Sequence, residues 1–93
     1  MPLLSDTDLR AALASLPGWS LADGKLHREY RFADFVQAFA FMTAVALIAE
    51  SMEHHPDWSN VWNRVTVDLS THDAGGITDL DLKMAENMNR FAE

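Results

Sequence analysis

Three of the four histidines stand next to breaks in the predicted secondary structure. His54 and His55 follow a long apolar segment and come directly before Pro56, while His72 follows an alternating segment that ends at Leu69. Imidazole titrates near neutrality, so one such group can donate a proton while another accepts one. If the two segments pack as neighbours, both ends open into one cleft, and general acid/base chemistry on a small molecule is predicted there.

Carboxylates and aromatic rings accompany these histidines, and the rings suit a flat heterocyclic ligand. Glu50 lies one helical turn before His54, so we expect both on one helix face. Further side chains expected around the cleft are Trp58, Trp62, Asp73 and Asp81. Structural roles compete with this interpretation, because a helix C-terminus favours histidine without any function. Asp81 also fits a capping box, Asp73 fits a turn, and tryptophan is more often a core residue.

The amino-acid composition excludes several classes of function. The 93 residues, 48% of them hydrophobic, predict a single domain spanning residues 1–93. The absence of cysteine excludes a disulfide scaffold, a thiolate zinc site and a cysteine nucleophile. A net charge of −7 disfavours direct binding of nucleic acid. No glycine-rich phosphate loop and no serine nucleophile elbow is found.

No targeting segment is visible, because the first residues have no basic region and no apolar run. The most apolar stretch, residues 35–49, is shorter than the roughly 20 residues that a membrane span needs. We therefore expect a buried helix there, no membrane association and a cytoplasmic protein.

Capping and turn signals define the elements. Capping-box spacing marks three helix starts, at Ser5, Asp34 and Thr78, and Asp23-Gly24 is a strong hairpin signal. In chain order we predict a helix ending at Pro17-Gly18, strands at 19–21 and 26–32, a helix at 34–53, strands at 58–61 and 65–69, and a last helix from Thr78. This α-β-β-α-β-β-α order predicts an α+β fold, a four-stranded antiparallel sheet with three helices packed on one face.

The long helix carries more apolar surface than one sheet can cover. Its large residues form two rows: Phe35, Phe39 and Met42, and Phe41, Val45, Ile48 and Met52. One row is expected against the sheet and the other against a second subunit. On the last helix, the expected inner side carries Leu80, Met84, Met88 and Phe91.

The spacing Glu50-x3-His54-His55-Pro56-x5-Trp62-x9-His72-x8-Asp81 resembles the signature of the pterin-4a-carbinolamine dehydratases, also called 4a-hydroxytetrahydrobiopterin dehydratases. Segments 35–42, 53–62 and 69–78 resemble that family as well, so the resemblance covers essentially the whole chain. It implies the same α+β fold, with two subunits joining sheets edge to edge and long helices packing dimers into a tetramer.

The resemblance also implies a reaction. The substrate is a 4a-hydroxytetrahydropterin, left when a pterin-dependent aromatic amino-acid hydroxylase has used oxygen, and loss of water gives quinonoid dihydropterin for tetrahydrobiopterin recycling. No metal or organic cofactor is required. Vertebrate members also act as a dimerisation cofactor for a homeodomain transcription factor, a role for which no feature of this sequence speaks.

Carried over by position, the catalytic residues implied are His54, His55 and His72. The residues implied to bind the pterin or support its site are Glu50, Pro56, Trp58, Thr71, Asp73, Ala74 and Asp81. We hypothesise that His54 or His55, at the helix C-terminus, is the acid that protonates the departing hydroxyl. His72, oriented by Asp73 or Asp81, would be its partner.

Two other functions compete with a dehydratase. Two histidines and a carboxylate can form a metal triad, and the candidate ligands are Glu50, His54, His72 and Asp73. Alternatively, the long apolar helix of residues 34–53 could bind a partner helix in a protein without enzymatic activity. Adjacent histidines fit that second function poorly.

Overall fold

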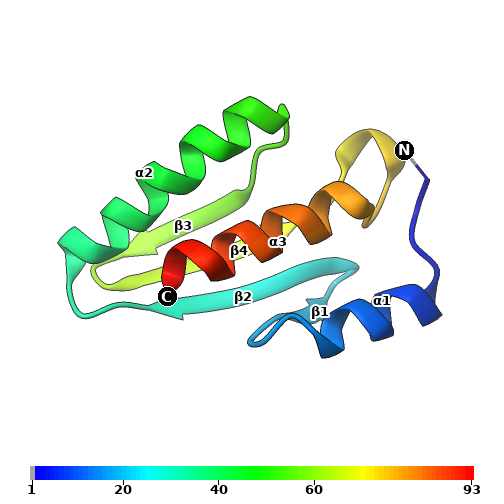
Figure 1. The fold of residues 1–93 in the computed structure, drawn as a ribbon, viewed down its shortest axis with the longest axis horizontal. Coiled ribbons are helices and arrows are strands. Elements are labelled where there is room, and N and C mark those ends of the chain that lie inside the picture. The colour runs from blue at the N-terminus through cyan, green and yellow to red at the C-terminus, as the bar shows by residue number, and fades with distance from the viewer. Residues whose placement is uncertain (1) are drawn as a thin grey trace.

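The computed structural model describes residues 2–93, in which a four-stranded antiparallel sheet carries its helices on one face (Figure 1). The elements are α1 (Asp6–Ala14), β1 (Ser20–Ala22), β2 (Lys25–Arg31), α2 (Phe35–Met52), β3 (Asp57–Val61), β4 (Arg64–Leu69), the 3-10 helix η1 (His72–Ala74) and α3 (Asp79–Ala92). The strands lie in the order β1-β2-β4-β3. The predicted fold class and element order are confirmed.

The predicted caps explain where the helices begin. The Ser5 side chain accepts a hydrogen bond from the Asp8 N–H at 3.1 Å, and the Asp34 side chain accepts one from the Gln37 N–H at 2.8 Å. A full capping box opens α3 at Thr78. These bonds satisfy backbone donors that the first turn of a helix leaves free, so each cap fixes the start of its helix.

The core lies between the sheet and the helices. On the sheet it is built from alternate residues of β2 and β4, whose register pairs Leu26 with Leu69 and Tyr30 with Val65. The helices contribute Leu9 from α1, four residues of α2, and Met84, Ala85 and Met88 from α3. The opposite face of the sheet is polar and carries the His27–Asp68 pair, whose Nδ1 and Oδ1 atoms are 2.9 Å apart. This face lies away from the helices.

One side of α2 is buried and the other is not. Its buried residues are Ala38, Phe41, Val45 and Ala49, whereas Phe35, Val36, Phe39 and Leu47 are exposed. We call the second group the outer face of α2. By length and composition alone, α2 could span a membrane, since its mean hydropathy is 1.6. Its inner side, however, packs on the core of this fold. The expectation of a buried helix holds for one side only.

The inner side of α3 differs from the prediction. Met84 and Met88 are fully buried as expected, but Leu80 is only half-buried and Phe91 is 43% exposed. The buried face is set by Asp81, Met84, Ala85 and Met88, so at about 100° per residue Leu80 and Phe91 lie at its edge. The prediction placed the buried face of α3 incorrectly because it followed apolar residues only, whereas the buried face includes the carboxylate of Asp81.

Candidate active site

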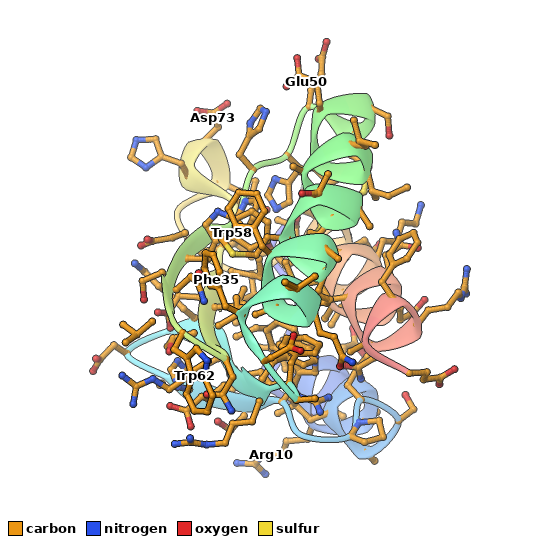
Figure 2. The ribbon with its side chains drawn as sticks, turned by 90° about the vertical axis from the view of Figure 1, so that its left-hand side faces the viewer. Arg10, Phe35, Glu50, Trp58, Trp62 and Asp73 are labelled. Carbon is orange, nitrogen blue, oxygen red and sulfur yellow. The ribbon has the colours of Figure 1, made fainter. Side chains whose placement is uncertain are left out.

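A pocket of about 300 Å³ opens where α2 and β4 end and η1 begins. The lining residues are Glu53, His54, His55, Ser70, Thr71, His72, Asp73 and Leu80. Figure 2 shows Glu50 and Asp73 at this end of the molecule, and Trp62 at the opposite end. All three histidines predicted to act together therefore line one pocket.

The end of α2 directs its two histidines to different places. Glu53 adopts a left-handed conformation, with φ 53°, and its N–H donates to Glu50 O at 3.2 Å. The His54 N–H donates to Ala49 O at 3.1 Å, which completes a Schellman motif. This reversal turns His54 inward, where it is 8% exposed, and leaves His55 exposed.

His54 pairs with a carboxylate from α3. Its Nε2 lies 2.6 Å from Oδ1 of Asp81, which is fully buried. The other carboxylate oxygen, Oδ2, accepts hydrogen bonds from the Thr78 N–H and the Thr71 hydroxyl, each at 2.9 Å. Asp81 therefore completes the cap of α3 and holds His54 with the same carboxylate.

His54 lines the pocket, and its second ring nitrogen, Nδ1, is the one that is not held by Asp81. Within residues 2–93 it forms no hydrogen bond to a protein group, and no buried side-chain nitrogen or oxygen there lacks a partner. Nδ1 is therefore not buried. It is the atom through which His54 can exchange a proton with a bound molecule.

Glu50 contacts the second histidine, His55, and not His54. Its Oε1 lies 2.8 Å from Nε2 of His55, and both side chains are exposed, by 81% and 65%. The expectation that Glu50 accompanies His54 on one helix face is wrong, because the Schellman turn takes His54 off the helix and toward α3.

His72 stands on a short loop at the rim of the pocket. The loop is closed by the Thr71 N–H, which donates to Gly76 O at 2.7 Å, and by Gly75 at φ 77°, a conformation that favours glycine. His72 is exposed and pairs with no carboxylate in the described part of the chain. The hypothesis that Asp73 or Asp81 orients it is wrong, since neither carboxylate forms a hydrogen bond or ion pair with His72 and Asp81 is engaged with His54.

The remaining predicted residues lie behind or beside the pocket. The ones that do not line it are Glu50, Pro56, Trp58, Ala74 and Asp81. Trp58 packs on the core from β3, and Trp62 is 63% exposed in the β3–β4 turn, so the expectation that Trp62 lies near the cleft is wrong. Three lining residues were missed: Glu53, Ser70 and Leu80, each a close neighbour of a predicted position.

The proposed metal ligands do not converge. In residues 2–93 no group of three or more His, Asp or Glu side chains is placed to hold a metal ion. Glu50 is hydrogen-bonded to His55, and His54 to Asp81, so two of the four candidates are held by other partners. The donor set that a metalloenzyme needs is not found in this part of the chain.

An α+β domain with a histidine-lined pocket over a buried carboxylate is thus the class that the fold and site define. Comparison with known proteins makes this specific. The family model for pterin 4 alpha carbinolamine dehydratase matches residues 2–91. A relative from Solibacter usitatus, provisionally named as such a dehydratase, is 54% identical over 89 residues, which is 96% of this chain and 94% of that protein.

A second relative with that provisional name, from Afipia carboxidovorans, is 55% identical over 92 residues, covering 97% of this chain and 92% of the relative. A crystal structure of a transcriptional coactivator/pterin dehydratase from Brucella melitensis superposes with a TM-score of 0.95 at 45% identity, covering 98% of this chain and 99% of the other. The chain belongs to the pterin-4a-carbinolamine dehydratase family, a family of lyases.

Proposed function

We propose that this protein removes water from 4a-hydroxytetrahydropterin by histidine general acid/base catalysis, giving quinonoid dihydropterin. Family membership supports the reaction class. The observation that supports the mechanism is the pairing of His54 with the buried carboxylate of Asp81 at the wall of a pocket. A histidine held in this way has one defined nitrogen available for proton exchange.

The reaction needs two proton movements. The C4a–O bond breaks, the departing hydroxyl takes up a proton to leave as water, and N5 loses a proton as its bond to C4a becomes double. One group must lie within hydrogen-bond reach of the departing hydroxyl and another within reach of N5–H. His54, which follows α2, and His72, on η1, both line the pocket and can supply these two groups.

We assign the acid to His54 and the base to His72. A proton on Nδ1 makes His54 an imidazolium whose charge is balanced by the carboxylate 2.6 Å from Nε2. His72 has no carboxylate partner in the described part of the chain and is exposed, so it can present a neutral nitrogen to N5. His55, held by Glu50 at the rim, completes the set of three catalytic histidines.

Two exposed features of the subunit support a further proposal about its assembly. The outer face of α2 is apolar and exposed, and β3 is an edge strand of the sheet. Both features suit self-association into a homodimer or homotetramer. We also propose a cytoplasmic protein that recycles tetrahydrobiopterin for a pterin-dependent hydroxylase, which is the source of such a substrate.

Stopped-flow dehydration of freshly generated 4a-hydroxytetrahydropterin tests the proposal. Because the reaction also proceeds without enzyme, the quantity compared is the rate above background. We expect wild-type protein to accelerate it and the His54→Ala/His55→Ala variant to lose at least about a hundredfold of that acceleration. His27→Ala is the matched control, since His27 lies on the polar face of the sheet and pairs with Asp68.

Circular dichroism establishes that each variant remains folded. Absence of acceleration by wild type would overturn the proposal and favour a binding protein that uses the outer face of α2. Full activity in the folded double variant would overturn the assignment of the site while leaving the reaction in place.

A further inference from the structure

Two buried threonines lie beneath the His54–Asp81 pair. Thr78, the N-cap of α3, is fully buried, and Thr71, the residue before η1, is 9% exposed. Their hydroxyl oxygens are 2.6 Å apart. A capping threonine needs only to accept a hydrogen bond from the helix backbone. The second contact, to Thr71, therefore exceeds what the cap requires.

The hydrogen bonds of this group have one direction. A threonine hydroxyl carries a single hydrogen, and that of Thr71 is donated to Asp81 Oδ2 at 2.9 Å. The short contact between the two hydroxyls therefore has Thr78 as its donor. The Thr78 oxygen in turn accepts from the Leu80 N–H at 3.3 Å. The chain runs from the first turn of α3 through both threonines to the carboxylate.

This direction fixes which nitrogen of His54 carries a hydrogen. Asp81 Oδ2 accepts from two donors, the Thr71 hydroxyl and the Thr78 N–H, so the carboxyl group acts as an ionised acceptor. With Asp81 ionised, its other oxygen, 2.6 Å from His54 Nε2, can only accept, and Nε2 is the donor. Nδ1 is left as the nitrogen that gains and loses a proton.

We propose that Thr78 is a positioning residue for His54: through Thr71 it holds the Asp81 carboxylate in place, and this carboxylate orients the imidazole as the Nε2–H tautomer and leaves Nδ1 for proton exchange in the pocket. The Thr78 hydroxyl holds that of Thr71, which in turn holds the Asp81 carboxylate in place, so loss of the first hydroxyl disturbs the geometry of the bond between Asp81 Oδ1 and His54 Nε2. The effect on turnover rests on the proposed dehydratase function, whereas the effect on the imidazole signals of His54 does not.

The imidazole nitrogen signals of the ¹⁵N-labelled protein test the tautomer directly. They are recorded in the alkaline range, where each ring carries one proton. We expect wild type and Thr78→Ser to show His54 as Nε2–H with the same Nε2 chemical shift, and Thr78→Val to keep that tautomer with a displaced Nε2 chemical shift. An Nδ1–H signal for His54 in wild type would overturn the proposal, and so would an unchanged Nε2–H signal in Thr78→Val.

Loss of the helix cap needs its own control, because Thr78→Val also removes the acceptor for Leu80. Ser5→Ala removes the corresponding cap of α1 and leaves the pocket untouched. It should lower stability through loss of a cap, with no change in the His54 signals. Should Thr78→Val fail to fold, Thr78→Gly provides the same test, since glycine is a tolerated N-cap without a hydroxyl.

The steady-state kinetics of the same variants give a second test of the role of Thr78. We expect Thr78→Val to lower kcat about tenfold with KM changed less than about twofold, the size that follows from losing one buried hydrogen bond. Thr78→Ser should restore kcat, and Ser5→Ala should leave it unchanged. Equal kcat values in Thr78→Val and Ser5→Ala would show a purely structural cap and overturn the proposal. An inactive wild type would refute the dehydratase function, yet the nitrogen signals would still decide the tautomer.

Discussion

Asp81 and His54 are 27 residues apart in the chain, yet their Oδ1 and Nε2 atoms lie 2.6 Å from each other in a buried position. The same carboxylate accepts the Thr78 N–H and so completes the cap of α3. One side chain thus fixes both the start of α3 and the orientation of a histidine that follows α2. Disturbing either contact should affect the pocket and the fold together.

His72→Ala should lower turnover without lowering stability. His72 is exposed and pairs with no carboxylate in the described part of the chain, so its removal costs few contacts. As a proton acceptor it should contribute about a hundredfold or more to the rate. The measurement is kcat beside the thermal midpoint of the variant. Unchanged kcat would contradict the role assigned to His72.

Glu50→Gln should leave stability nearly unchanged. The Glu50–His55 pair is exposed on both sides, and exposed ion pairs contribute little because water screens them. We expect the free energy of unfolding in urea to change by less than about 0.5 kcal/mol. A loss several times larger would show that this pair is shielded, as it would be if another subunit covered it.

Stability should fall as the pH rises from about 10 to 12. Burial raises the pKa of Tyr30 to about 12 from its ordinary value of 10.0, although the neighbouring Arg28 opposes the shift. Within this range the unfolded chain loses the phenol proton while the folded chain keeps it, so unfolding becomes more favourable. Tyr30 is the only tyrosine, so tyrosinate absorbance reports this group alone.

Tyr30→Phe is the control for this pH dependence, because it cannot ionise. The variant should show a smaller decrease in unfolding free energy over the same range. It should also be less stable at neutral pH, since it lacks the hydroxyl that donates to Asn89. Ionisation of wild-type Tyr30 near pH 10 in the folded state would refute the prediction.

Phe39→Asp should dissociate an oligomer without unfolding the subunit. Phe39 lies on the outer face of α2 and is 54% exposed within one chain, so the core loses little when it is replaced. Sedimentation analysis should show a smaller species than wild type. Gln37→Asp, an exposed change on the same helix but off the outer face, should behave as wild type. A wild-type protein that sediments as a monomer would contradict self-association.

The sequence predicted those parts of the fold that depend on local signals. Cap residues such as Asp34 and Thr78 act within one helical turn, and Asp23-Gly24 forms a turn in which both residues have positive φ. The meeting of His54, His55 and His72 was predictable because each follows the end of an element. These signals suffice for the topology and for the position of the pocket.

The pairings inside the pocket were not predictable in the same way. His54 turns away from Glu50 because Glu53 adopts a left-handed conformation, for which its residue type gives no signal. Trp62, at φ 50°, likewise occupies a turn that a bulky residue seldom forms, and so lies at the far end of the sheet. Which carboxylate meets which histidine is decided by packing between α2 and α3.

The most direct test of the account is a double-mutant cycle on His54 and Asp81. Dehydration kinetics would be measured for His54→Ala, Asp81→Asn and the combined variant, each shown to be folded by circular dichroism. If Asp81 acts through His54, Asp81→Asn should lower kcat about tenfold or more in wild type but less than about twofold in the His54→Ala background. An equal loss in both backgrounds would show that Asp81 acts independently, and would contradict the account.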